Sequence, residues 1–365
     1  MALLILHVAQ PTVDGVARCV TDLAADQIRH GHNVVVACPA DGWLAEQAKA
    51  AGARHVTWRA GRSPGPASAL ETLRLARIAR RQAPDLVHLH SSKAGLAGRL
   101  ALRGRRPTIF QPHAWSFFAE QGRLRAVAAS WERRATRWTD VIVCVSRGEE
   151  LAGRAAGVDG DLRVVPNGID LRAFAAPGPG EREEARERLG LGSAPLAVCV
   201  GRLSEQKGQD VLVDAWPQVV AEVPGAELVL VGTGPKEETL RARVRVTGEV
   251  ENVRDWLVAA NVVVQPSRWE GLPYTVLEAM ATARAVVATD VAGMADALGD
   301  NAALVAVDDR AALVREIGRR LLDGAASDEE GRTLRERVER HFDLRATTRA
   351  MADLYAEVLE RRRAQ

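Results

Sequence analysis

Two glutamates in the stretch PSRWEGLPYTVLEAM, residues 266–280, are spaced for joint chemistry only if the chain bends between them. Glu270 and Glu278 are eight positions apart, which in one continuous helix would put them about 80° apart around the axis and roughly 12 Å apart along it. Pro273 suits the first turn of a helix and disrupts its interior, so we expect the helix to begin near Leu272 or Pro273. Glu270 then lies in the entry loop, and a loop that doubles back lets both carboxylates and the first-turn amides face one ligand. The alternative is one capping acid and one exposed helical glutamate.

Two cations, Arg202 and Lys207, form a second candidate in the stretch VGRLSEQKG at 200–208. The stretch follows an expected strand and leads into a helix, and two cations beside a helix N-terminus are suited to holding a diphosphate without a metal. The alternative is two solvated surface charges. The stretch is not a P-loop, because GxxxxGK[ST] is absent, and no GxGxxG follows either opening strand, which disfavours nicotinamide and flavin cofactors.

Two more residues of interest follow expected strands of the first half. Gly15 lies in QPTVDGVARC just before a helix, and His113 lies in QPHAWSF. A lone histidine is as readily a hydrogen-bonded structural residue as a chemical one, so both interpretations stay open here. Asp159 and Asp161 form a DGD that resembles a metal-binding DxD, but it precedes a strand and lies in an expected turn, so we expect no metal there.

The elements that must position these residues are short apolar runs alternating with segments of helical period. The expected strands of the first half are LLILHVA, NVVVACP, RHVTW, DLVHLH, PTIFQPH, VIVCVS and LRVVPNG, and those of the second half are LAVCVG, ELVLVG, VRVTG, VVVQPS, AVVAT and ALVAV. Strands that are apolar throughout and alternate with helices favour parallel sheets covered on both faces. Ligands of such sheets bind beyond the carboxyl ends of the strands, which is where the candidate residues lie.

We therefore expect an α/β protein with two doubly wound, Rossmann-like αβα domains facing across a cleft. The first would cover residues 1–172 and the second residues 173–345, with the breaker stretch AAPGPGE at 175–181 near the junction. Residues 310–365 have a purely helical pattern, and we expect the last helix, residues 346–365, to pack back on the first domain. A length of 365 residues agrees with two domains.

Composition limits the class of protein and its partners. The chain is 47% hydrophobic and 26% charged, as an ordinary globular protein is. It has no apolar run of membrane-spanning length and no basic leader, so we expect a cytoplasmic protein. The four cysteines, Cys19, Cys38, Cys144 and Cys199, show no CxxC and no zinc-ligand spacing, and are expected to be buried.

Charge is distributed unevenly along the chain. Residues 1–172 carry 24 Lys and Arg against 15 Asp and Glu, a net charge of +9, and the remainder carries 25 against 32, a net charge of −7. The basic first half fits an anionic partner, including peripheral contact with a membrane, or simply a solvated surface. Nucleic acid is disfavoured because no basic run is interleaved with aromatic side chains on a recognisable binding module.

Aromatic residues and arginines do interleave at 115–138. Such a segment is either an amphipathic lid that meets a lipid surface or a core-packed helix with an arginine-rich outer face, and we favour the second interpretation.

Taken together, Gly15, His113 and the stretches VSRGE, PNGID, GRLSEQKG and EGLPYTVLEAMA resemble the family 4 retaining glycosyltransferases of GT-B fold. The resemblance spans residues 3 to about 298 in the order that the family shows. The combination of GR-x4-KG with E-x7-E is highly specific. It implies that both glutamates converge on one nucleotide-sugar.

The resemblance implies a role for each matching residue. Arg202 and Lys207 would neutralise the donor diphosphate, Glu278 would bind the ribose hydroxyls, and Glu270 would contact the transferred sugar. Gly271, Leu272, Pro273 and Tyr274 would lie against sugar and phosphate, although Pro273 has no amide hydrogen to donate. His113 would bind the sugar near the reacting carbon. Gly15 would allow close backbone approach, with Asp14–Gly15 standing where the family often has two glycines.

The implied activity is metal-free transfer of a hexosyl group from a nucleotide-diphosphate sugar, UDP or GDP being the expected carriers, to an acceptor hydroxyl. No cofactor beyond this donor is expected. The acceptor stays open between a lipid-linked saccharide, a polysaccharide precursor and a small metabolite, in bacterial polysaccharide or natural-product biosynthesis. Two alternatives are a nucleotide-sugar 2-epimerase of similar architecture and a non-catalytic nucleotide-sugar binding protein.

Overall fold

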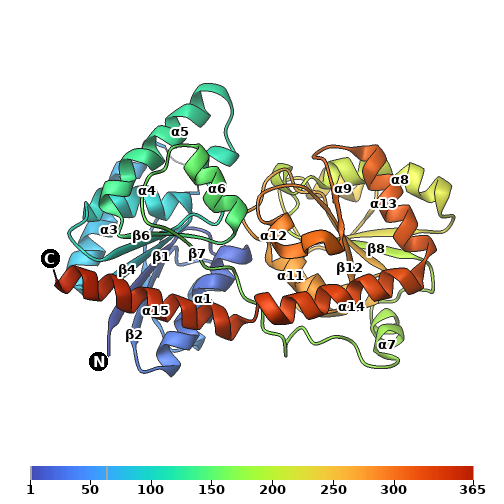
Figure 1. The fold of residues 1–365 in the computed structure, drawn as a ribbon, viewed down its shortest axis with the longest axis horizontal. Coiled ribbons are helices and arrows are strands. Elements are labelled where there is room, and N and C mark those ends of the chain that lie inside the picture. Colours follow the sequence, from blue (N-terminus) through green and yellow to red (C-terminus); the bar gives the residue numbers. More distant parts are fainter. Residues whose placement is uncertain (1, 63–64, 365) are drawn as a thin grey trace. The chain divides into compact units, whose positions relative to one another are not determined.

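The computed structural model describes residues 2–62 and 65–364, which form two compact units (Figure 1). The first unit comprises Met1–Asn167 and Arg345–Gln365, and the second comprises Gly168–Leu344. Each unit is built on its own sheet, in which every pair of neighbouring strands is parallel. The expectation of two parallel-sheet α/β domains is thereby confirmed.

The division between the units lies a little upstream of the expected boundary at 172/173. It falls after Asn167 because the next residues already pair within the second unit. The amide of Ile169 donates to the Phe342 carbonyl at 2.8 Å, and the amide of Leu344 donates to the Ile169 carbonyl at 3.1 Å. The stretch AAPGPGE at 175–181 is thus inside the second unit, and the chain rejoins the first unit at Arg345.

The sheet of the first unit has seven strands in the order β3-β2-β1-β4-β5-β6-β7. Their bounds are β1 (Leu4–Ala9), β2 (Asn33–Cys38), β3 (Arg54–Thr57), β4 (Leu86–His90), β5 (Thr108–Gln111), β6 (Val141–Cys144) and β7 (Leu162–Val164). Each coincides with an expected apolar run. The strand order reverses between β1 and β4, so the loops that follow β1, β4 and β5 meet at one stretch of the carboxyl edge.

Helices cover both faces of this sheet, as Figure 1 shows in blue to green and, for the last helix, red. They are α1 (Asp14–Arg29), α2 (Trp43–Ala50), α3 (Ser68–Gln82), α4 (Ser91–Leu102), α5 (Gly122–Ala135), α6 (Arg147–Ala155) and α15 (Leu344–Arg363), with short 3-10 turns at Ser116–Phe118 and Thr136–Trp138. One apolar layer joins α3 and α4 to the sheet, and a separate layer joins α1 and α2 to the opposite face. Alternation along each strand explains the two layers, because successive side chains point to opposite faces.

The sheet of the second unit has six strands in the order β10-β9-β8-β11-β12-β13. Their bounds are β8 (Leu196–Val200), β9 (Glu227–Val231), β10 (Arg245–Val246), β11 (Val262–Gln265), β12 (Ala285–Thr289) and β13 (Ala303–Val305). The helices are α7 (Glu181–Arg188), α8 (Gln209–Glu222), α9 (Glu237–Arg241), α10 (Val253–Ala259), α11 (Tyr274–Ala281), α12 (Met294–Leu298), α13 (Arg310–Leu322) and α14 (Gly324–His341), with 3-10 turns at Glu205–Lys207 and Gly299–Asn301. Here the strand order reverses between β8 and β11.

The aromatic and arginine-rich stretch at 115–138 differs in part from the core-packed helix that we favoured. Trp115 and Phe117 are buried, as expected. The first half of α5 is not, because residues 121–127 are all exposed. Leu124 and Val127 are each 65% exposed, so this half of the helix presents apolar side chains to solvent.

Other expectations concern residues without a role in the site. Asp161 pairs with Arg163 and Arg361, so in the structure the DGD stretch carries an ion-pair cluster. All four cysteines are buried and unbridged, as expected. Within residues 2–62 and 65–364, no helix combines the length and the apolar character that a membrane span requires.

Candidate active site

Lys207 and Glu270, drawn from two different loops of the second unit, form an ion pair. Lys207 ends the 3-10 turn that follows β8, and Glu270 lies in the loop that follows β11. The Lys207 Nζ donates to Glu270 Oε1 at 2.6 Å. Since β8 and β11 are the neighbours between which the strand order reverses, the pair lies where open α/β sheets bind ligands.

Backbone and side-chain hydrogen bonds connect the same two loops. The Arg268 amide donates to the Gln206 carbonyl at 2.7 Å, and Gln206 Nε2 donates to the Trp269 carbonyl at 3.1 Å. The Arg268 guanidinium donates hydrogen bonds to both carboxylate oxygens of Asp210, at 3.0 and 3.1 Å. These contacts fix the separation of the loops and hence the position of the Lys207–Glu270 pair.

Glu270 is also held from its own loop by residues that sequence reasoning missed. Ser267 Oγ donates to Glu270 Oε1 at 2.8 Å, and Gln265 Nε2 donates to Ser267 Oγ at 2.9 Å. Both supporting side chains are fully buried. Gln265 ends β11, and a polar residue at the end of an otherwise apolar strand was the signal available, because buried polar groups need partners.

Close backbone approach at two glycines brings these loops together. Gly208 has φ +64°, and a Cβ there would lie 2.0 Å from the carbonyl oxygen of Pro266. Gly293 has φ +82°, and a Cβ there would lie 1.6 Å from the carbonyl oxygen of Gly271. Only glycine fits both the left-handed backbone and the space. The loops after β8 and β12 thus both lie against the 266–271 segment.

Helix α11 begins at Tyr274, directly after the expected start. Pro273 is its N-cap, with extended φ −74° and ψ 131°. Gly271, Leu272 and Tyr274 are buried beside it, and Glu278 lies in the second turn. Glu270 and Glu278 are each only 6% exposed, so the alternative of an exposed helical glutamate is wrong.

Arg202 follows β8 by two residues and is half-buried. Its carbonyl accepts a hydrogen bond from Gln209 Nε2 at 3.1 Å. The tight path of 202–209 places Arg202 and Lys207 in one compact turn that leads into α8, as the sequence suggested.

Gly15 and His113 belong to the first unit and follow β1 and β5. Gly15 is the second residue of α1, after Asp14 with φ +65°. His113 and Ala114 have backbone φ angles of +58° and +126°, which residues other than glycine rarely adopt. Such backbone persists only where neighbours hold it.

Glu149, in the VSRGE stretch, holds the His113 loop. Its carboxylate accepts the amide of Ala114 at 2.7 Å and the amide of Val145 at 2.7 Å. Burial raises the pKa of Glu149 to about 7, while the two amides act in the opposite direction. We assigned no individual role to this residue from the sequence.

Three further histidines form a cluster that reaches His113 through His90, and no spacing in the sequence groups them. His90 Nδ1 lies 3.1 Å from His113 Nε2, and His90 Nε2 lies 2.9 Å from His7 Nδ1. Ring nitrogens of His7, His88 and His90 all lie within 4.8 Å of one another, close enough to be considered as metal ligands. The available signal was a histidine inside each of two apolar strands, LILHVA and LVHLH.

Family models match both units of the chain. Residues 13–173 match the model described as Glycosyltransferase Family 4, and residues 194–323 match the model described as Glycosyl transferases group 1. The two matches together cover the candidate residues Gly15, His113, Arg202, Lys207, Glu270 and Glu278.

Two curated relatives are about one third identical to the chain over the aligned parts. The lipopolysaccharide core biosynthesis mannosyltransferase LpsB of Rhizobium meliloti is 31% identical in an alignment of 306 residues, and the match covers 75% of this chain and 84% of the relative. A GDP-mannose-dependent alpha-(1-6)-phosphatidylinositol monomannoside mannosyltransferase of Mycobacterium tuberculosis is 34% identical in an alignment of 238 residues, and the match covers 59% of this chain and 60% of that protein.

Among solved structures, Anabaena Alr3699/HepE in complex with UDP and glucose superposes with a TM-score of 0.83. It is 21% identical, and the match covers 97% of this chain and 99% of that one. At this identity the likeness shows the fold.

Proposed function

The chain belongs to the family 4 glycosyltransferases of GT-B fold, and from that membership we propose that it transfers a hexosyl group from a nucleoside-diphosphate sugar to an acceptor hydroxyl with retention of configuration and without a metal. The family models and named relatives are glycosyltransferases. They give no support to the 2-epimerase alternative.

The observation that carries the proposal is the Lys207–Glu270 pair at the strand reversal of the second unit. Departure of a nucleoside diphosphate develops negative charge on its β-phosphate. Fixed cations such as Lys207 and Arg202 stabilise that charge more in the transition state than in the ground state. Glu270, which accepts hydrogen bonds from Lys207 and Ser267, would accept further ones from hydroxyls of the transferred sugar, and Glu278 would accept them from the ribose hydroxyls.

The reaction breaks the bond from the anomeric carbon to the β-phosphate oxygen and forms a bond from that carbon to the acceptor oxygen. We assign attack to the face from which the diphosphate departs, which retains configuration. The acceptor proton then passes to the departing phosphate oxygen, so no protein nucleophile is needed. His113, fixed by its loop, would bind the sugar beside the reacting carbon.

A hollow lined by arginines supports an anionic acceptor. The hollow, about 1040 Å³, lies beside the ends of β2 and β3 and against α3 in the first unit. Its lining includes Arg59, Arg74, Arg77 and Arg81, with Asp41 as the acid. Neither Arg77 nor Arg81 has an acidic partner in the described parts of the chain. Unpaired guanidiniums favour phosphate or carboxylate ligands, so we propose that this hollow holds the charged end of a phosphorylated or lipid-linked acceptor.

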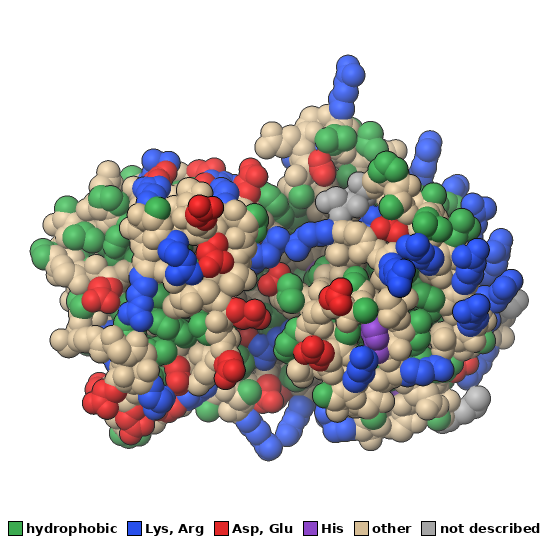
Figure 2. All heavy atoms as spheres, turned by 180° about the vertical axis from the view of Figure 1, so that it is seen from behind, with side chains coloured by type: hydrophobic (Ala, Val, Ile, Leu, Met, Phe, Trp, Pro, Cys, Tyr) green, Lys and Arg blue, Asp and Glu red, His purple; other side chains and the backbone are tan. Residues whose placement is uncertain are grey.

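Contact with a membrane would bring a lipid-linked acceptor to the enzyme. On the face shown in Figure 2, the first unit, on the right, presents many more Lys and Arg side chains than Asp and Glu. The exposed half of α5 adds Leu124 and Val127 beside Arg123 and Arg125. Apolar side chains flanked by cations suit the surface of an anionic bilayer. We propose a cytoplasmic enzyme with peripheral contact through this helix.

The test starts with the donor. UDP-, GDP- and dTDP-sugars are screened for thermal stabilisation, because a ligand that binds only the folded state raises Tm. The stabilising donor is then incubated with phosphorylated and unphosphorylated acceptors in the presence of EDTA. We expect product with the anomeric configuration of the donor, and better turnover with the phosphorylated acceptor. Inverted product, a requirement for added metal, or absence of stabilisation by every donor would overturn the proposal.

A further inference from the structure

Four histidines of the first unit, three of them buried, form one cluster on the face of the sheet that α1 and α15 cover. His7 is on β1, His88 and His90 are on β4, and His113 follows β5. The parallel register places His7 opposite His88, and His90 is two residues further along the same face. His7, His88 and His90 are fully buried.

The ring nitrogens of three of these histidines form a continuous chain of contacts that begins at Gln27. Gln27 Oε1 lies 2.9 Å from His7 Nε2, His7 Nδ1 lies 2.9 Å from His90 Nε2, and His90 Nδ1 lies 3.1 Å from His113 Nε2. Every link has hydrogen-bond length. Burial lowers the pKa of His7 to about 4 and that of His113 to about 3, so the rings are neutral at physiological pH.

A neutral imidazole has one N–H donor and one acceptor nitrogen, so the first link decides all the others. The amide oxygen of Gln27 can only accept, which puts the proton of His7 on Nε2. His7 Nδ1 then accepts, so His90 carries its proton on Nε2. By the same step His113 carries its proton on Nε2 and has Nδ1 left as an acceptor.

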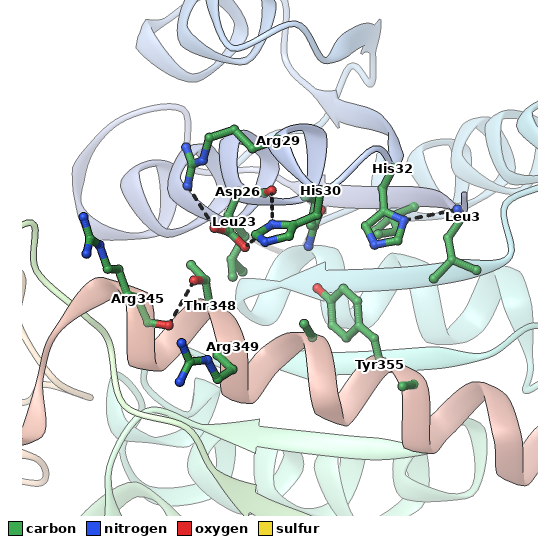
Figure 3. A pocket seen from close by; sticks show the side chains of 14 residues that line it. Leu3, Leu23, Asp26, Arg29, His30, His32, Arg345, Thr348, Arg349 and Tyr355 are labelled. Carbon is green, nitrogen blue, oxygen red and sulfur yellow. Dashed lines mark hydrogen bonds and ion pairs between the residues drawn. The ribbon is translucent and has the colours of Figure 1, made fainter. Parts of the chain in front are cut away.

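Tyr355 of α15 fixes which way the Gln27 amide points. Its hydroxyl lies 2.6 Å from His88 Nδ1, and the Gln27 side chain acts to lower the pKa of the phenol, as a donor to its oxygen does. Burial raises the pKa of this phenol far above its usual range, so the hydroxyl keeps its proton and can donate to His88. Gln27 then donates its amide nitrogen to the phenol oxygen and presents its carbonyl to His7. Figure 3 shows Tyr355 projecting from α15 at the cavity, about 490 Å³, that Gln27 also lines.

We propose that Gln27, His7 and His90 are positioning residues that hold His113 as the Nε2-protonated tautomer, with Nδ1 available to accept a hydrogen bond from a hydroxyl of the donor sugar. The last clause rests on the proposed function, whereas the tautomer does not. Without the relay, an imidazole bound to a sugar hydroxyl could present either nitrogen as donor or acceptor. With it, the ring is fixed before substrate arrives, which lowers the cost of ordering it.

A transition metal held by His7, His88 and His90, or by Cys19, His90 and His113, is the competing explanation of the cluster. A metal would need a nitrogen lone pair from each histidine that it binds. Both nitrogens of His90, which belongs to both sets, already have histidine partners, at 2.9 Å and 3.1 Å. The relay is therefore the arrangement that the contacts support.

The tautomers are measured directly by nitrogen-15 NMR of the full chain labelled at histidine, because protonated and lone-pair ring nitrogens differ widely in chemical shift. His7→Gln, His90→Gln and His113→Gln assign the three signals. We expect Nε2 protonated in all three rings, unchanged between pH 8 and pH 6. A His113 protonated on Nδ1, averaged shifts at its two nitrogens, or stoichiometric metal in the purified chain would overturn the relay.

Two matched substitutions at Gln27 test how the relay affects the His113 tautomer and turnover. Gln27→Met keeps the shape of the side chain and removes the acceptor, whereas Gln27→Glu keeps an acceptor oxygen. We expect averaged His113 shifts and a kcat/KM about 5- to 50-fold lower in Gln27→Met, a fixed tautomer in Gln27→Glu, and unchanged affinity for the free nucleoside diphosphate in both. Tyr355→Phe provides a second perturbation with the ring packing kept, should Gln27→Met unfold.

The Gln27→Met variant distinguishes the tautomer relay from the sugar-binding role of His113. Averaged shifts in Gln27→Met with unchanged turnover would retain the relay and refute the sugar-binding role of His113. A fixed tautomer in Gln27→Met would refute the relay, whatever the activity.

Discussion

Lys207 and Glu270 are 63 residues apart in sequence, yet the ammonium of one donates to the carboxylate of the other at 2.6 Å. The pair is nearly enclosed, with 16% and 8% of the two side chains exposed. A diphosphate that binds Lys207 must therefore share the ammonium with Glu270 or displace it. This competition gives the two residues different expected phenotypes.

Removal of the ammonium should weaken nucleotide binding. Lys207→Met should reduce the affinity for UDP or GDP by about 10- to 100-fold, because a hydrogen bond to a charged group contributes roughly 1.5–3 kcal/mol. Glu270→Gln should leave nucleotide affinity unchanged or raise it, since it frees Lys207, while lowering turnover with the complete donor. Calorimetry measures the affinities. Lys49→Met, at an exposed lysine of the first unit, is the control and should change affinity less than about threefold.

Gly208 should be intolerant of any side chain. Gly208→Ala introduces a Cβ 2.0 Å from the Pro266 carbonyl, so the loops that carry Lys207 and Glu270 must separate. The matched control is Gly225→Ala, which shares a positive φ of +83° but has nothing within 4 Å of the added Cβ. We expect Gly208→Ala to lose at least about 2 kcal/mol more stability than the control, by the usual cost of overpacking, with donor affinity falling in parallel. Equal losses in the two variants in urea unfolding would count against the close-approach argument.

Acid should destabilise the first unit through its histidines. Burial lowers the pKa of His7 to about 4 and of His113 to about 3, and holds those of His88 and His90 well below the usual 6.5. Below pH 6.5 the unfolded chain binds protons that the folded chain does not, so the free energy of unfolding falls as pH drops from 6.5 toward 4. Each such histidine contributes a slope of up to about 1.4 kcal/mol per pH unit.

Glu149 acts in the opposite direction over part of this range. Its folded pKa of about 7 lies above the usual 4.5, so its contribution to stability is lost as pH rises from 4.5 to 7. Denaturant unfolding between pH 7.5 and 5 gives the net slope of the free energy of unfolding against pH. His7→Gln should reduce this slope by the contribution of one proton, which is up to about 1.4 kcal/mol per pH unit. A slope that stays the same in His7→Gln would mean that His7 titrates alike in the folded and unfolded states.

Glu149→Gln should disturb the His113 loop. The carboxylate accepts two backbone amides, and an amide side chain can accept only one of them while turning its own donor toward the other. Leaving a buried donor unpaired costs about 1–3 kcal/mol. We expect that loss of stability and a higher KM for the donor sugar with unchanged affinity for free nucleotide. Wild-type stability in Glu149→Gln would contradict the assigned role of the carboxylate.

The strands and the loops that carry Lys207 and Glu270 were predictable from the sequence alone. Apolar runs bounded by glycine and proline mark buried parallel strands without reference to the rest of the chain, and the thirteen strands within residues 2–62 and 65–364 all lie in such runs. Pro273 marked the start of α11 because proline is tolerated at the first turn of a helix and disrupts its interior. The motifs after β8 and β11 then pointed to one site, since carboxyl ends of parallel strands share an edge.

What only the tertiary structure decided depends on register and on which faces meet. The cluster of His7, His88 and His90 exists because β1 and β4 pair with His7 opposite His88, and no local pattern fixes the register of strands so far apart in sequence. The hydrogen bonds from Ser267 to Glu270 and from the Ala114 amide to Glu149 could not be predicted from the sequence either. Each depends on how the whole unit packs. Local sequence thus determined the elements and their loops, and long-range packing determined which polar side chains found each other, because a buried polar group takes the partner that the assembled fold places within reach.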